Sequence, residues 1–234
     1  MSAIGNLRIV SEAHPCNEDG LRALFLAQPC ETVEPGAALF FQGDPAFHVF
    51  HLVSGNVRIC RFLADGHRFI IGFLRAGDLI GLSFRSRYMF GAEAIDQVVF
   101  RRMNKRMFEE ELQMVPEQRS EMLAHLRDEI TASQDHMLLL CRKNAEERVC
   151  TFLLDRLDRS DAPDLVSLPM IRSDIADYLG MTIETVSRTL TKLVFKGIIL
   201  PAEKHQFRVA SRSALARHAN EANDHQSEAQ RHLR

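Results

Sequence analysis

A long stretch without glycine, residues 116–160, separates two parts of the chain that differ in composition. No proline follows Pro116 within it, so we expect either one long helix or two helices that abut. Apolar or small residues recur there at alternating intervals of three and four, the spacing of a two-in-seven seam. The seam consists of Leu123, Leu126, Ile130, Ser133, Met137 and Leu140. Because a helix packed on its own domain shows a wider apolar stripe, this spacing favours a helix-on-helix dimer contact over a core helix.

The part of the chain before this stretch, from about residue 20 to residue 100, consists of short apolar runs separated by turns. Residues 49–53 and 69–73 are two of the runs, and Ser54-Gly55-Asn56 and Ala76-Gly77-Asp78 are two of the turns. Glycine, asparagine and aspartate supply positive φ angles or local side-chain hydrogen bonds. Many short strands at this spacing predict a β-sandwich or a small barrel, with an irregular α+β domain as the alternative.

The part after residue 163 predicts two short helices joined by a glycine turn. Residues 172–179 form the first helix, Gly180 the turn, and Thr182 the N-cap of the second helix. The second helix has an apolar stripe that is expected to face a core: Ile183, Val186, Leu190 and Leu193. A different, polar face carries Glu184, Ser187, Arg188 and Thr191. This is the helix-turn-helix layout, and residues 198–200 and 206–209 predict a hairpin, or wing, behind it.

Local charge is consistent with binding to a polyanion. Between Leu168 and Arg212, seven basic residues stand against four acidic ones, whereas the whole chain has a net charge of −2. The overall charge excludes a uniformly basic nucleic-acid coat protein. A basic segment in an acidic chain is the expected footprint of phosphate contacts, the alternative being a merely solvated helix face.

Other features exclude whole classes of protein. No apolar run approaches the roughly 18 residues of a membrane span, and residues 1–10 lack the pattern of a signal peptide. Five cysteines, an odd number, fit a reducing compartment, so we expect a cytoplasmic protein without a membrane partner. No P-loop, His-Glu-x-x-His or nucleophile elbow is present, and we expect no enzyme.

Histidines and cysteines show no spacing that predicts a metal site. His48 and His51 face opposite sides of an expected strand, and we interpret the histidines as surface or hydrogen-bonded groups. Cys141 and Cys150 are nine residues apart, on opposite faces of the expected helical stretch, and cannot bridge within one helix. Buried structural thiols are favoured over a redox switch.

Three separated segments resemble one family, the CRP/FNR family of bacterial transcription regulators. Residues 174–188, Asp-Ile-Ala-Asp-Tyr-Leu-Gly-Met-Thr-Ile-Glu-Thr-Val-Ser-Arg, resemble its helix-turn-helix. Residues 134–148 are particularly similar to the FNR and FixK branches. Residues 41–44, 52–55 and 76–81 match the glycine-punctuated strands of its β-roll.

The resemblance spans roughly residues 20–213 and implies an α+β fold. An N-terminal β-roll, like the cyclic-nucleotide-binding jelly roll, would be followed by a long dimerisation helix and a C-terminal winged helix-turn-helix. The expected parts are an N-terminal arm (1–19), a β-roll sensor-like domain (20–115), the dimerisation helix (116–145), the DNA-binding domain (146–213) and a polar tail (214–234).

The resemblance also implies which residues read DNA. A Glu-x-x-Ser-Arg pattern reads bases in FNR-like members, and here it stands as Glu184, Ser187 and Arg188. A carboxylate accepts from cytosine N4, a guanidinium donates to guanine O6 and N7, and a hydroxyl serves either. The implied target is a TTGA-type palindrome bound by a homodimer. The expected backbone contacts are Arg172, Thr182, Thr185 and Lys192. Ile171 departs from the family, which often has a capping threonine there.

Effector sites known in the family are not matched. Cyclic-nucleotide binders need an acidic residue and an Arg-Ser pair around the buried phosphate, but here Leu82 follows Gly81 and Phe90-Gly91 stands near the place of the pair. Iron–sulfur members need four thiolates in reach. The corresponding region offers only Cys16 and Cys30 without Cys-x-x-Cys, and Phe100 occupies the place of the central ligand.

An FNR-like reading helix without cluster cysteines is the pattern of the FixK branch. It implies a cofactor-free and metal-free regulator, in most cases an activator that works with RNA polymerase, of genes for microaerobic respiration or nitrogen fixation. The alternative within the family is a switch that binds a small molecule or haem, or responds to redox state, through the β-roll. An alternative from another class is a catalytic β-barrel with an incidental helical tail.

Overall fold

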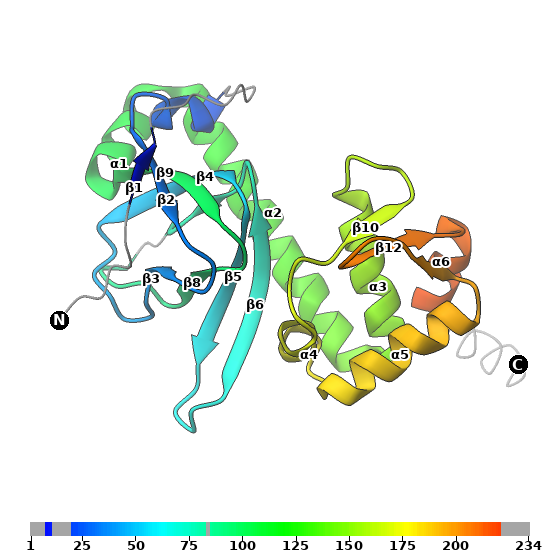
Figure 1. Cartoon of the computed structure of the whole chain (residues 1–234). Coiled ribbons are helices and arrows are strands. Elements are labelled where there is room, and N and C mark those ends of the chain that lie inside the picture. Colours follow the sequence, from blue (N-terminus) through cyan, green and yellow to red (C-terminus); the bar gives the residue numbers. More distant parts are fainter. Residues whose placement is uncertain (1–7, 11–19, 83–84, 221–234) are drawn as a thin grey trace, which may run out of the picture. The chain divides into compact units, whose positions relative to one another are not determined.

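The structure, a computed structural model, describes residues 8–10, 20–82 and 85–220. The chain divides within its long helix α2 into two compact units, Met1–Ile130 and Thr131–Arg234. The first is built mainly of strands and the second mainly of helices, so the predicted α+β class is confirmed (Figure 1). Most of the expected N-terminal arm and of the polar tail lies outside the described residues.

The N-terminal unit consists of two antiparallel sheets. One has the strand order β1-β2-β9-β4-β7 and the other β3-β8-β5-β6. The strands are β1 (Arg8–Val10), β2 (Cys30–Val33), β3 (Ala38–Phe40), β4 (His48–Ser54), β5 (Asn56–Phe62), β6 (Arg68–Arg75), β7 (Leu79–Ile80), β8 (Gly91–Ala94) and β9 (Val98–Asn104). The turn between β4 and β5 requires glycine, because Gly55 has φ +88° and a Cβ there would lie 2.4 Å from the carbonyl oxygen of Gln97.

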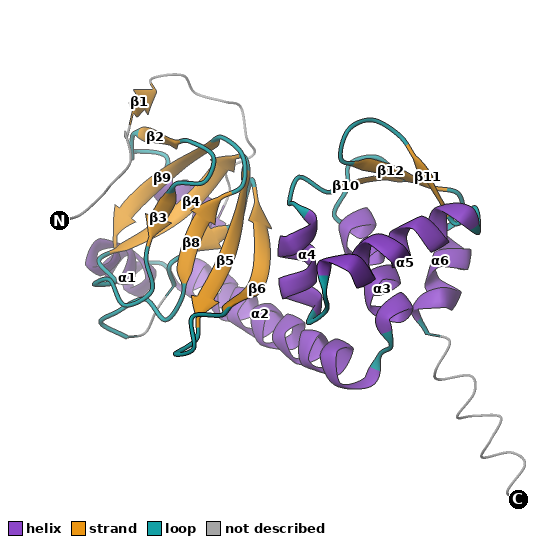
Figure 2. Ribbon diagram, turned by 60° about the horizontal axis from the view of Figure 1, so that its bottom comes forward, coloured by secondary structure: helices purple, strands orange, loops and turns teal. Residues whose placement is uncertain are grey.

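The two sheets lie against each other (Figure 2), and apolar side chains from both form the core between them. Phe50 and Leu52 of β4 meet Val57 and Ile59 of β5 there. The outer face of the first sheet is covered by the 3-10 helix η1 (Gly20–Phe25), helix α1 (Lys105–Met114) and the first turns of α2 (Pro116–Arg142). Burial on both faces explains why β4 reads as a continuous apolar run rather than as an alternating strand.

His51 contradicts the interpretation of the histidines as surface or hydrogen-bonded groups. It is 2 % exposed, its ring lies 5.8 Å from that of Phe25, and its Nδ1 has no hydrogen-bond partner among the described residues. Burial, together with the charges of Arg22 and Arg101, lowers the pKa of the imidazole to about 4. The sequence places His51 in an apolar run, which is the pattern that could have indicated its burial.

We therefore expect the N-terminal unit to lose stability in acid. The unfolded chain takes up the His51 proton near pH 6.5, and the folded chain only near pH 4. The free energy of unfolding of the N-terminal unit therefore falls as the pH drops through this range, by at most roughly 3 kcal/mol. Urea unfolding at pH 7.5 and pH 4.5 measures this fall in the free energy of unfolding. His51→Gln should reduce the fall, whereas the control His67→Gln, at an exposed histidine, should leave it unchanged. An equal fall in wild type and His51→Gln would contradict this assignment.

The stretch without glycine forms two helices, α2 and α3 (Ala145–Asp158). α2 ends at Arg142 rather than at the expected residue 145. Asn144 begins α3 with a capping box, because its side chain accepts from the backbone of Glu147 while the Glu147 carboxylate accepts from the Asn144 N–H. Cys141 and Cys150 therefore lie on different helices rather than on one. The prediction of buried thiols is confirmed for Cys30, Cys60 and Cys150 and is wrong for Cys141, which is exposed.

In the C-terminal unit the helices pack together, and a small sheet lies on one side of them (Figure 2). After α3 its elements are β10 (Leu165–Ser167), α4 (Arg172–Leu179), α5 (Ile183–Phe195), β11 (Ile199–Pro201), β12 (Gln206–Val209) and α6 (Arg212–Ala219). Leu153, Leu179, Leu193 and Leu215 are fully buried and come from four different helices. Among the described helices, none is both long and apolar enough to cross a membrane.

Candidate nucleic-acid interface

Helices α4 and α5 form the predicted helix-turn-helix. α4 begins after Ile171, whose side chain makes no capping hydrogen bond, and ends at Gly180, which adopts the left-handed conformation with φ +60°. Thr182 caps α5, since its hydroxyl accepts from the backbone N–H of Thr185 at 3.2 Å. The predicted bounds of α4, the glycine turn and the threonine cap are all confirmed.

Helix α5 has one buried and one exposed face. Val186, Leu190 and Leu193 are buried, as their spacing predicts. The prediction is wrong for Ile183, which is 51 % exposed because the first turn of α5 projects beyond the core. The three expected base-reading side chains, Glu184, Ser187 and Arg188, are all exposed and share the polar face. This face can offer an acceptor, a hydroxyl and a guanidinium to a partner.

The residues expected to contact the DNA backbone have different surroundings. Arg172 is half-buried, with its guanidinium 5.5 Å from the centre of the Phe207 ring, and burial lowers its pKa. Thr182 and Thr185 hydrogen-bond to each other through their hydroxyls at 2.9 Å. Lys192 is exposed and lies on α5, but its Nζ is 2.5 Å from a carboxylate oxygen of Glu146. Sequence reasoning missed this ion pair because 46 residues separate its partners.

A single arginine, also missed by sequence reasoning, holds the turn of the helix-turn-helix. Arg148 donates from Nη1 to the carbonyl oxygens of Leu179, at 2.9 Å, and Gly180, at 3.3 Å. Its Nη2 donates to Leu140 near the end of α2, and its Nε to Lys143 at the α2–α3 junction. The guanidinium thus fixes three backbone segments of this unit to one another.

The wing is present and larger than expected. β11 and β12 form the predicted antiparallel hairpin, and β10 adds a strand on the other side of β12. The ion pair of Arg208 with Asp164 connects β12 to the segment that precedes β10. This sheet packs near the C-terminal half of α5, through contacts of α5 with β11, so the wing and the polar face of α5 belong to one folded body.

The residues of the predicted seam on α2 differ in exposure. Leu123, Ile130 and Met137 are each about 60 % exposed, and Ser133 is exposed. Leu138, outside the predicted seam, is 56 % exposed as well. The other two members are half-buried within their own units: Leu126 packs against the cluster around Phe108, and Leu140 lies beside Gly180. The exposed members form an apolar row along α2 that the described residues leave uncovered.

The β-roll interior is filled by its own side chains. The Phe40 ring stacks on Tyr88 at 3.9 Å and on Phe50 at 5.4 Å. A pocket of about 380 Å³ opens beside β3, β5 and β8, and its charged lining residue is Glu93, paired with Arg58 at 2.8 Å. The described residues contain no group of three or more His, Cys, Asp or Glu side chains that could hold a metal.

Comparison with known proteins connects both units to characterised domains. Residues 147–218 match the Crp-like helix-turn-helix domain, and residues 30–114 match the cyclic nucleotide-binding domain. The chain is 40 % identical over 206 residues to the transcriptional activatory protein AadR of Rhodopseudomonas palustris, covering 85 % of this chain and 83 % of that protein.

Proteins named for nitrogen-fixation regulation are similar as well. The nitrogen fixation regulation protein FixK of Bradyrhizobium diazoefficiens is 39 % identical, over 70 % of this chain and 71 % of that protein. The solved structure of FixK2 from Bradyrhizobium japonicum superposes with a TM-score of 0.78 and is 34 % identical, over 82 % of this chain and 96 % of that one.

Proposed function

The chain belongs to the CRP/FNR family and is a DNA-binding transcription regulator of the FixK/FNR type, and from this premise we propose that it binds a TTGA-type palindrome as a homodimer. The observation that carries the proposal is the exposed face of α5, on which Glu184, Ser187 and Arg188 stand together. A guanidinium reads guanine O6 and N7, and a carboxylate accepts from cytosine N4, so this face suits the G·C pair of each half-site.

The backbone contacts proposed for each protomer surround this face. Arg172 begins α4, Thr182 and Thr185 stand at the N-terminus of α5, and Lys192 follows Arg188 by one helical turn. Helix N-termini and cationic side chains are common phosphate contacts in DNA complexes. We propose that these four residues position α5, while the three base-reading residues select the sequence.

The proposed dimer forms through α2. Leu123, Ile130 and Met137 expose apolar surface that a second copy of the same helix would cover. Two-fold symmetry then presents two copies of α5 to half-sites about one helical turn apart. We retain the proposed division into β-roll (20–115), dimerisation helix and DNA-binding domain (146–213) with two changes. The dimerisation helix ends where α2 ends, and α6, whose Leu215 is buried in the C-terminal unit, extends the DNA-binding domain to Ala219 and shortens the expected polar tail.

We propose that the regulator acts without a bound cofactor, as an activator that contacts RNA polymerase in the cytoplasm. Leu82 after Gly81, and Phe90-Gly91 near the place of the Arg-Ser pair, support the absence of a cyclic nucleotide. The likeness to FixK proteins supports a role in genes for microaerobic respiration or nitrogen fixation. A β-roll that binds an effector is the competing function within this family.

Arg188→Ala is expected to lower discrimination at the G·C pair of the half-site. Wild-type protein, purified with no added effector, should bind a TTGA/TCAA palindrome and discriminate against one with the G·C pairs replaced by A·T. The expected difference is about 1–3 kcal/mol per half-site. Fluorescence anisotropy with both duplexes measures it, and Arg188→Ala should lose most of this difference, because only Glu184 and Ser187 then read the pair.

The matched control is Arg217→Ala, which removes an exposed guanidinium from α6 in the same unit. This variant should discriminate as wild type does. Undiminished discrimination by Arg188→Ala would refute the assignment of this side chain to base reading. Specific binding that appears only after an effector is added would favour the competing function.

A further inference from the structure

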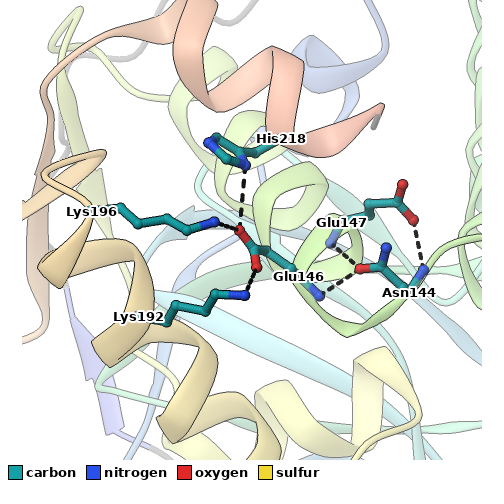
Figure 3. Close-up of polar contacts among 6 residues, drawn as sticks. All are labelled: Asn144, Glu146, Glu147, Lys192, Lys196 and His218. Atoms are coloured by element: carbon teal, nitrogen blue, oxygen red, sulfur yellow. Dashed lines mark hydrogen bonds and ion pairs between the residues drawn. The ribbon is translucent and has the colours of Figure 1, made fainter. Parts of the chain in front are cut away.

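Glu146 lies in the first turn of α3 and reaches across to α5 (Figure 3). One carboxylate oxygen is 2.5 Å from Nζ of Lys192, and the other is 2.6 Å from Nζ of Lys196. Nδ1 of His218, on α6, lies 3.3 Å from the second oxygen. A single carboxylate therefore connects α3 with Lys192 of α5, with Lys196 at the C-cap of α5, and with α6.

These lysines continue the row of side chains that begins with the base-reading residues. Glu184, Arg188, Lys192 and Lys196 follow one another at intervals of four, which places each roughly one turn after the last. Lys192 belongs to the proposed backbone contacts, and Lys196 caps the C-terminal end of α5. Both lysines are thus near the surface where the proposed function places DNA phosphates.

The carboxylate is held in its charged form. The Glu146 side chain is 14 % exposed, and although burial raises its pKa, the hydrogen bonds and charges of Lys192 and Lys196 outweigh burial and lower the pKa overall. Ion pairs of this kind are less screened by salt than fully exposed pairs. The carboxylate and the two ammonium groups together carry one net positive charge instead of two.

We propose that Glu146 competes with DNA phosphate for Lys192 and Lys196 and so restrains sequence-independent binding. Phosphate neutralisation supplies most of the affinity for non-specific DNA and makes it dependent on salt. A carboxylate that already occupies the two ammonium groups lowers this contribution without touching the base-reading side chains. This inference rests on the proposed function, because it presumes that α5 faces DNA.

Glu146→Gln tests the proposal, since it removes the charge and retains the shape of the side chain. Affinities for the palindrome and for a scrambled duplex are measured between 50 and 300 mM salt. Both affinities should rise at low salt by on the order of tenfold, and the slope of log affinity against log salt should steepen by about 0.9 per protomer. Discrimination between the two duplexes should stay unchanged.

The matched control is Asp161→Asn, which removes one negative charge from the same unit at an exposed residue without an ion pair among the described residues. Its slope should equal that of wild type. If the salt slope steepened equally in Glu146→Gln and Asp161→Asn, the proposal would be overturned, because the net charge of the unit would then explain the effect. The double variant Glu146→Gln with Lys192→Gln should return the slope toward that of wild type.

A purely structural role for Glu146 predicts a different result. Glu146→Gln would then bind both duplexes more weakly and discriminate less, which would overturn the proposal. Circular dichroism shows whether each variant is folded. The same affinities are measured for Glu146→Ala, which leaves no polar side-chain group to be buried at this position. Loss of the fold in both variants would likewise assign Glu146 to stability alone. If wild type itself fails to distinguish the palindrome from the scrambled duplex, the proposed function fails instead.

Discussion

Ile130→Glu is expected to convert the proposed dimer into monomers and to lower the affinity for a palindromic site by on the order of 10²-fold or more. Ile130 stands in the middle of the seam, where two-fold symmetry would bring it close to its own copy. Two glutamates there would face each other in an apolar contact, with neither partner nor solvent to stabilise the charge. Each protomer would then have to bind its half-site alone.

The structure makes this substitution a clean test of association. Ile130 is 60 % exposed in the single chain, so the change removes little packing from the fold of the protomer. Leu126 would be a poorer choice, because it packs against the apolar cluster of its own unit. Sedimentation velocity measures the oligomeric state, and anisotropy with the palindromic duplex measures the affinity.

Ala132→Glu is the matched control for the added charge. Ala132 is exposed on the same helix but lies outside the seam. We expect this variant to remain dimeric and to bind DNA as wild type does. A dimer that survives Ile130→Glu would show that the seam is misassigned and that another surface joins the protomers.

Elements with local rules were predictable from the sequence. The left-handed turn at Gly180 needs a residue without Cβ, and the start of α5 needs a side-chain acceptor, which Thr182 provides. The helical period predicted the buried residues Val186, Leu190 and Leu193. The exposure of Ile183 was not predictable in this way, because periodicity defines a face and says nothing of how far the core extends along it.

The break between α2 and α3 was predictable in principle. The absence of glycine and proline favours a continuous helix, but Asn144 followed three residues later by Glu147 is the pattern of a capping box. Both side chains make the reciprocal hydrogen bonds in the structure. The composition left one long helix and two abutting helices open, and the local capping motif decides for two.

Contacts between distant segments had no such local rule. β10 is a strand only because it pairs with β12, which follows it by about 40 residues. Glu146 forms ion pairs with Lys192 and Lys196 only because α3 packs against α5. The heptad spacing likewise cannot show that Leu126 packs within its own unit while Ile130 stays exposed. These features depend on tertiary packing, which the spacing of one helix does not contain.

Arg148→Ala is expected to destabilise the C-terminal unit by about 3 kcal/mol. The guanidinium donates to carbonyl oxygens of Leu140, Lys143, Leu179 and Gly180, and a hydrogen bond from a charged donor contributes about 1.5–3 kcal/mol. Alanine would leave these acceptors to partial hydration, so the four contributions do not add in full. The turn that orients α5 would lose its attachment to the α2–α3 junction.

Hydrogen exchange measures this effect where it should occur. Amides of α4 and α5 are expected to exchange about 100-fold faster in Arg148→Ala, while those of β4 in the N-terminal unit keep their wild-type rates. Arg148→Lys should recover little, because one ammonium cannot reach carbonyl oxygens on three segments at once. Arg217→Ala, which removes an exposed guanidinium from α6, should leave both sets of amides unchanged. Wild-type exchange of α4 and α5 in Arg148→Ala would mean that the turn is held by the apolar contacts of Leu179 instead, since Leu179 is fully buried beneath it.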